Sequence, residues 1–118
     1  MKKILIIEDD EDIVNLTVLL LEREGYEVHS FTRYQGYENA VNECNPNLVL
    51  LDLNLGGYHG KDICRYIKHQ DHLKQIKVIL MSANLDIEKV KDEVAADAFI
   101  CKPFNIADFL QKIKININ

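Results

Sequence analysis

The fold of this chain is decided by residues 48–57, which read LVLLDLNLGG. Four apolar residues in succession predict a strand that is buried on both faces. The carboxylate of Asp52 follows where this strand ends, and the glycine pair at residues 56 and 57 predicts a loop. Ligands of an open parallel sheet bind outside the carboxyl ends of its strands. We therefore expect Asp52 to lie at the functional edge of the sheet.

The composition is typical of one compact globular domain, which we expect to span residues 1–118. The chain is 47% hydrophobic and 28% charged, and its net charge is −5. This charge argues against binding of nucleic acid or anionic membranes, because there is no excess of cations to neutralise phosphates. No apolar run approaches the roughly 20 residues that span a bilayer. We expect a cytoplasmic protein.

The cysteines agree with that compartment. Cys44, Cys64 and Cys101 form no C-x-x-C pair, and their odd number would leave one thiol over if two were bridged. Free cysteines are among the residues most often buried. We expect all three to be reduced and most of them to be buried.

Alternating patterns divide the chain into strands and helices. Apolar runs predict strands over residues 4–7, 48–51, 78–81 and 98–101. Residues 26–31 mix apolar and polar side chains, as an edge strand does. Helical spacing of apolar residues predicts helices over residues 12–21, 37–44, 63–67, 87–94 and 106–113. Gly25 stands where the first helix should end, Asn105 can cap the last helix, and residues 53–60 are predicted to be a loop.

Five strands that alternate with five helices predict an α/β fold with a parallel sheet covered on both faces. Right-handed crossovers favour a doubly wound, flavodoxin-like sheet with strand order 2-1-3-4-5. In that order the first and third strands are neighbours. Glu8 and Asp9, at the end of the first strand, should therefore lie close to Asp52.

Such a cluster of carboxylates is costly unless a proton, a hydrogen bond or a cation compensates it. Oxygen ligands favour Mg²⁺, with Mn²⁺ as the alternative, over zinc. Ser82 and Lys102 also follow predicted strands, so a hydroxyl and a positive charge should lie at the same edge. Together these groups can hold phosphoryl oxygens around a carboxylate nucleophile. Asp52 would then become an aspartyl phosphate.

Four motifs in this order resemble those of the receiver domain of bacterial two-component response regulators, of the chemotaxis-regulator type. They are ILIIEDD at residues 4–10, LLDLNL at residues 50–55 with Gly60, MSA at residues 81–83 and FICKPF at residues 99–104. The resemblance covers nearly the whole chain. It implies a Mg²⁺-dependent signalling domain that takes a phosphoryl group from a sensor histidine kinase or a histidine phosphotransfer protein and then changes a partner-binding surface.

The resemblance implies a role for each residue at the site. Asp52 aligns with the phosphoacceptor, and Lys102 with the lysine that pairs with the phosphate. The metal ligands of the family align with Glu8, Asp9, Asp52 and the backbone carbonyl of Asn54. In the family pattern the acid at Asp9 binds Mg²⁺ directly, whereas the acid at Glu8 acts through water.

The resemblance also implies how the signal is transmitted. Ser82 aligns with a switch hydroxyl that reorients to bond the phosphoryl group, and Phe99 aligns with the coupled aromatic position. Pro103 would follow a cis peptide bond that helps to aim Lys102. Asn54 and Asn84 occupy positions that tune hydrolysis of the phosphate.

The sequence departs from the family pattern in several places. Gly56 stands where proline is usual and His59 where aspartate is common, which should loosen the loop after Asp52. Phe99 replaces the common tyrosine and lacks its hydroxyl, so no phenolic hydrogen bond can distinguish the inward from the outward rotamer. Residues 82–102 form a stretch about two residues shorter than usual. This puts in question the fourth helix and the surface that receivers use to dimerise.

Two other classes of function stay open. A pseudo-receiver would use the fold as an interaction module that phosphorylation does not control. An enzyme on a similar framework would need other residues. A haloacid-dehalogenase-type phosphatase needs a second acid where Asn54 stands. A flavodoxin needs a phosphate-binding loop rich in hydroxyl and amide groups after the first strand, whereas the four acids found there would repel the phosphate of FMN. We expect no conventional enzyme, only phosphotransfer to the protein itself and slow self-dephosphorylation.

The expected partners follow from the resemblance. Besides the phosphodonor, they are a downstream protein or a fused output domain, and a second copy bound through the fourth helix, fifth strand and fifth helix. We expect no direct contact with nucleic acid or membrane. We expect a stand-alone receiver in preference to a fragment of a longer regulator.

Overall fold

A five-stranded parallel sheet forms the centre of the computed structural model, which describes residues 1–55, 58–84 and 86–118. In spatial order its strands are β2 (Glu27–Phe31), β1 (Lys3–Ile7), β3 (Leu48–Asp52), β6 (Lys77–Ser82) and β7 (Ala98–Cys101). Each neighbouring pair is parallel. The predicted doubly wound α/β fold and its strand order are confirmed.

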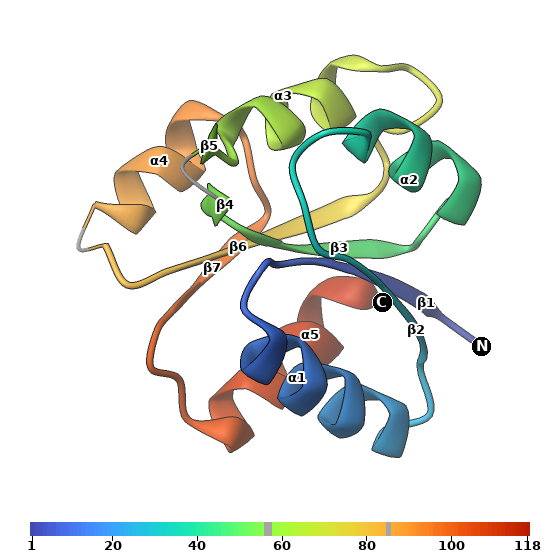
Figure 1. Ribbon diagram of the computed structural model, residues 1–118, viewed down its shortest axis with the longest axis vertical. Helices are drawn as coiled ribbons and strands as arrows, with labels where there is room; N and C mark the ends of the chain where they lie inside the picture. Colours follow the sequence, from blue (N-terminus) through green and yellow to red (C-terminus); the bar gives the residue numbers. More distant parts are fainter. Residues whose placement is uncertain (56–57, 85) are drawn as a thin grey trace.

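Helices cover both faces of this sheet, as Figure 1 shows. They are α1 (Glu11–Arg23), α2 (Tyr37–Cys44), α3 (Lys61–His69), α4 (Ile87–Glu93) and α5 (Ile106–Ile117). Helices α1 and α5 lie below the sheet in this view, and α2, α3 and α4 lie above it. None of these helices is both long and apolar enough to cross a membrane.

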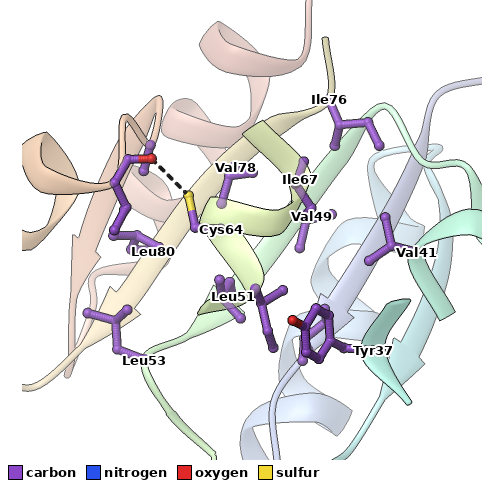
Figure 2. Close-up of a cluster of buried hydrophobic side chains, with 14 of the residues drawn as sticks. Tyr37, Val41, Val49, Leu51, Leu53, Cys64, Ile67, Ile76, Val78 and Leu80 are labelled. Atoms are coloured by element: carbon purple, nitrogen blue, oxygen red, sulfur yellow. Dashed lines mark hydrogen bonds between the residues drawn. The ribbon is translucent and has the colours of Figure 1, made fainter. Parts of the chain in front are cut away.

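The inner strands are buried on both faces, and their side chains alternate between two cores. Figure 2 shows the core beneath α2 and α3. Strands β3 and β6 and helices α2 and α3 contribute to it, through residues that include Tyr37, Val41, Val49, Leu51, Ile67, Val78 and Leu80. Full burial of one aliphatic side chain of this kind contributes about 1.5–3 kcal/mol. The continuous apolar runs of the sequence can therefore form strands, because successive side chains pack into the cores on opposite faces of the sheet.

The ends of the helices follow from capping. The side chain of Asp10 accepts hydrogen bonds from two backbone N–H groups of the first turn of α1, at 2.9 and 3.3 Å. The helix therefore begins at Glu11, one residue before the predicted start. Gly25, with φ at +90°, follows the end of α1 as predicted, and Asn105 caps α5.

The segment over residues 53–60 corrects one prediction. In place of a loop, it contains a small antiparallel pair, β4 (Asn54–Leu55) and β5 (Tyr58–His59). Leu55 is buried in the core beneath the helices, and two-residue strands are too short to show periodicity. The predictions for Gly56 and for the side chain of His59 lie outside the described residues.

The cysteines are free, as predicted, but their burial differs from the prediction. Cys64 is buried, Cys44 is half-buried and Cys101 is exposed. Cys101 ends β7, which is an edge strand and has a neighbour on only one side. An edge position of this kind leaves a side chain open to solvent in spite of the apolar residues before it.

Candidate functional site

The topology brings residues from distant parts of the chain to one edge of the sheet. In the register of β1 and β3, Ile7 lies beside Leu51. The residues that follow, Glu8 and Asp52, therefore emerge side by side. Lys102 directly follows β7 at the same edge, because all the strands are parallel.

Three carboxylates converge at this edge, as the sequence predicts. Glu8, Asp9 and Asp52 each offer one oxygen, and these oxygens lie within 4.8 Å of one another. Glu8 has no exposed surface, Asp52 is 6% exposed and Asp9 is exposed. A set of oxygen ligands that is open to solvent on one side suits a hydrated divalent cation such as Mg²⁺.

Lys102 neutralises part of this cluster. Its Nζ atom donates to Oε1 of Glu8 at 2.6 Å and lies 3.3 Å from Oδ1 of Asp52. The side chain of Lys102 is only 18% exposed, so these contacts are weakly screened by water. The Lys102-Pro103 peptide bond is cis, and the backbone N–H of Lys102 donates to the carbonyl of Ser82 at 2.9 Å.

The surroundings of the buried acid change its protonation. Burial, and next the hydrogen bond with Asp52, raise the pKa of Glu8 to about 7, although Lys102 lowers it. Burial lowers the pKa of Lys102, but the hydrogen bond with Glu8 and the charge of Asp52 outweigh this effect and raise it overall. The cluster therefore favours the protonated form of Glu8 more than water does.

Ser82 ends β6 and is 9% exposed, at the same edge as the carboxylates. Its Oγ atom accepts a hydrogen bond from the backbone N–H of Asn84 at 2.9 Å. The side chain of Asn84 is exposed, and its oxygen accepts from the backbone N–H of Asp86. These bonds hold the hydroxyl at the start of the segment that leads to α4.

Gly60 contributes to the site in a way that the motif alone does not reveal. A Cβ atom at Gly60 would lie 2.6 Å from the carbonyl oxygen of Asp52 and 3.1 Å from Cα of Leu53. The backbone N–H of Gly60 also donates to the carbonyl of Leu53 at 2.7 Å. Only glycine leaves room for this close approach, so the start of α3 supports the backbone of the central aspartate.

Two further residues that the sequence singled out lie on other elements. Asn54 is exposed at the start of β4, two residues after Asp52. Phe99 is half-buried in β7 and lines a groove of about 590 Å³ between β7 and α5, which none of the three acids lines. Lys112 also lines this groove and contacts Phe99 through its ring and its carbonyl oxygen. Sequence reasoning did not single out Lys112.

The fold and the site together define a class of protein. A doubly wound α/β domain presents a nearly buried aspartate at its functional edge, between an acidic pair and a lysine. A model of the response regulator receiver domain matches residues 4–114, which is nearly the whole chain. The chain belongs to this family: it is a receiver domain of the two-component signalling type.

Solved structures agree with that assignment. A CheY-like response regulator receiver domain from Methanospirillum hungatei has 31% identity and a TM-score of 0.88, over 99% of this chain and 94% of that one. The receiver domain of a DNA-binding response regulator from Colwellia psychrerythraea has 27% identity and a TM-score of 0.89, with 98% and 97% covered.

A third structure is described with a metal ion. It is the receiver domain of a sensor histidine kinase from Pseudomonas aeruginosa, with magnesium coordinated in its active-site cleft. It has 21% identity and a TM-score of 0.86, over 98% of this chain and 97% of that one. At this identity it supports the fold of the present chain.

Proposed function

We propose that this protein is a phosphoacceptor that receives a phosphoryl group on Asp52 from a sensor histidine kinase or a histidine phosphotransfer protein. The observation that carries the proposal is the position of Asp52, which lies 3.3 Å from the Lys102 ammonium and within 4.8 Å of Glu8 and Asp9. Asp52 therefore has a cation on one side and a pair of acids that could bind a metal ion on the other. A nucleophile that attacks a charged phosphoryl group needs both.

In the proposed step, a carboxylate oxygen of Asp52 forms a bond to phosphorus while the bond between phosphorus and the donor breaks. The donor nitrogen, or the oxygen of a small donor such as acetyl phosphate, leaves with the electron pair. Lys102 stays within reach of the transferred oxygens and offsets their charge. The hydroxyl of Ser82, whose oxygen accepts from the Asn84 backbone N–H, reorients to donate a hydrogen bond to the phosphoryl group.

The carboxylate cluster fits Mg²⁺, with Mn²⁺ as the alternative. We propose Glu8, Asp9, Asp52 and the backbone carbonyl of Asn54 as the groups that hold it, with Glu8 acting through water. A bound Mg²⁺ would neutralise charge that develops on the phosphoryl oxygens. The magnesium described for the Pseudomonas aeruginosa receiver domain supports this choice.

Transmission of the signal is the second part of the proposal. Ser82 and Phe99 form the switch, and the surface formed by α4, β7 and α5 meets the downstream protein or a second copy of the chain. Asn54 and Asn84 tune the lifetime of the phosphate, whose slow loss is a self-dephosphorylation and not turnover of a substrate. We propose that residues 1–118 act as one cytoplasmic domain without direct contact with nucleic acid or membrane.

The test is phosphorylation by acetyl phosphate in the presence of Mg²⁺, followed by intact-mass spectrometry. We expect the wild-type protein to gain one phosphoryl group, and Asp52→Asn or chelation of Mg²⁺ to abolish the gain. Asp12→Asn is the matched control, because Asp12 is an exposed acid outside the cluster. Labelling that survives Asp52→Asn would overturn the assignment of the nucleophile. Absence of labelling in the wild type would favour a pseudo-receiver.

A further inference from the structure

Lys112 makes two contacts with one residue of the neighbouring strand. From α5, its Nζ atom lies 4.6 Å from the centre of the Phe99 ring and also donates a hydrogen bond to the Phe99 carbonyl oxygen. Both side chains are half-buried. The carbonyl fixes the position of the ammonium group, and the ammonium group in turn lies over the face of the ring.

This geometry favours one orientation of the Phe99 ring. The face of an aromatic ring carries partial negative charge, so a cation above it is attracted, and the attraction is stronger where water is partly excluded. Phenylalanine has no hydroxyl group, so no hydrogen bond of its own can hold the ring in one rotamer. In the part of the chain that the structure describes, the Lys112 ammonium is the charged group that lies over this ring, and its attraction favours the observed orientation.

The same contact shapes the groove between β7 and α5. Phe99 and Lys112 both line it, together with Cys101, Phe104 and Asp108. A turn of the ring away from Lys112 would break the cation–π contact while the carbonyl contact stays. It would also change the shape of the groove, because the ring forms part of its wall.

We propose that Lys112 is a positioning residue that holds the Phe99 ring in the groove between β7 and α5 and thereby sets the balance between two ring orientations. The cation–π contact supplies the orientational preference that a phenolic hydroxyl would otherwise supply. The regulatory consequence rests on the proposed function: phosphorylation of Asp52 would have to overcome this contact in order to move Phe99. The positioning role itself does not depend on phosphorylation.

The first experiment uses the unphosphorylated full chain with ¹³C-labelled phenylalanine rings. The sequence has four phenylalanines, and the signal that disappears in Phe99→Leu identifies the ring of interest. We expect Lys112→Met to move this signal and to change the rotamer populations by about two- to fivefold, the range that a partly exposed cation–π contact supports. Lys112→Arg should preserve the wild-type signal, because a guanidinium group also stacks on rings.

Lys114→Met is the matched control, because Lys114 is an exposed lysine on the same helix and its side chain makes none of these contacts. It should leave the Phe99 signal unchanged. A Lys112→Met spectrum identical to that of the wild type would overturn the proposal. A thermal-melting cycle gives a second measurement: the effect of Lys112→Met should shrink in the Phe99→Leu background. Equal effects in both backgrounds would also overturn the proposal.

The phosphorylated protein separates this inference from the proposed function. After treatment with acetyl phosphate and Mg²⁺, the Phe99 signal should move less in Lys112→Met than in the wild type. The reason is that the substitution has already moved the ring part of the way. If Asp52 is not labelled at all but Lys112→Met still moves the ring signal, the proposed function fails and the positioning role stands. If Asp52 is labelled and Lys112→Met has no effect on the ring, the reverse holds.

Discussion

The ammonium group of Lys102 lies 2.6 Å from the carboxylate of Glu8, a residue without exposed surface that precedes it by 94 positions in the chain. The contact joins the ends of β1 and β7, which β3 and β6 separate in the sheet. Lys102 therefore acts as an internal cation for the acids of the site. The protonation of Glu8 and the stability of the protein are linked through it.

Glu8 should make the stability of the metal-free protein depend on pH. Its pKa is about 7 in the folded protein and 4.5 without that environment. A raised pKa means that its contribution is most favourable below pH 4.5, declines as the pH rises and is lost above about 7. Over this interval we expect the wild type to lose about 3 kcal/mol relative to Glu8→Gln. Urea unfolding in the presence of a chelator measures the difference, and parallel profiles would contradict it.

Mg²⁺ should stabilise the folded protein. A ligand at about 100 times its dissociation constant contributes about 2.7 kcal/mol, which corresponds to a rise in Tm of roughly 10 °C for a domain of this size. We expect Asp9→Asn to lose most of this rise, because Asp9 is the exposed acid of the cluster. Asp12→Asn should keep it. A Tm that stays constant across millimolar Mg²⁺ would rule out the metal site.

Loss of the lysine should have opposite effects on folding and on metal binding. Lys102→Met leaves two nearly buried carboxylates without their cation, and we expect the protein to lose about 3–5 kcal/mol of stability. Mg²⁺ should bind more tightly, because the site becomes more negative. Calorimetric titration and urea unfolding test both effects, with Lys89→Met as an exposed control. Weaker Mg²⁺ binding in Lys102→Met would contradict the proposed role of Lys102.

Gly60→Ala should disturb the site through the backbone of Asp52. The new methyl group would meet the Asp52 carbonyl oxygen at 2.6 Å, so the backbone must shift, at a cost of about 1–3 kcal/mol. We expect slower phosphorylation by acetyl phosphate. Gly25→Ala is the matched control, because Gly25 has open space around it and only its positive φ is strained. It should lower the Tm without slowing phosphorylation, and equal rates in the two variants would refute the prediction.

Asp97 should matter for stability and not for phosphorylation. Its carboxylate accepts from Nζ of Lys68 at 2.7 Å and from the backbone N–H of Val78 at 2.8 Å, which ties α3 to the start of β6. Asp97→Ala leaves both donors without this acceptor, and we expect a loss of about 2–3 kcal/mol. The rate of labelling of the folded protein should not change. A substantially slower rate would show that this end of the sheet acts on the site.

The fold was predictable because the strands repeat one simple pattern. A strand buried on both faces needs an unbroken apolar run, and the inner strands have one. The edge strand β2 was predictable for a different reason, because its mixture of apolar and polar residues is typical of a strand at the edge of a sheet. The pair β4 and β5 was missed because a strand of two residues is too short to show an alternation of apolar and polar side chains. The exposure of Cys101 was missed because the burial of the cysteines was inferred from the general preference of free thiols for the core, although the predicted strand order already places residues 98–101 at an edge.

The sequence by itself determined the doubly wound topology and the gathering of Glu8, Asp9, Asp52, Ser82 and Lys102 at one edge. The physical reason is that parallel strands send their carboxyl ends to the same side, whatever the detailed packing. Only the tertiary structure decided that Glu8 is buried while Asp9 is exposed, that Gly60 lies against the Asp52 carbonyl, and that Lys112 lies over Phe99. These relationships depend on distances of a few ångströms between separate elements, which no periodicity in the sequence encodes.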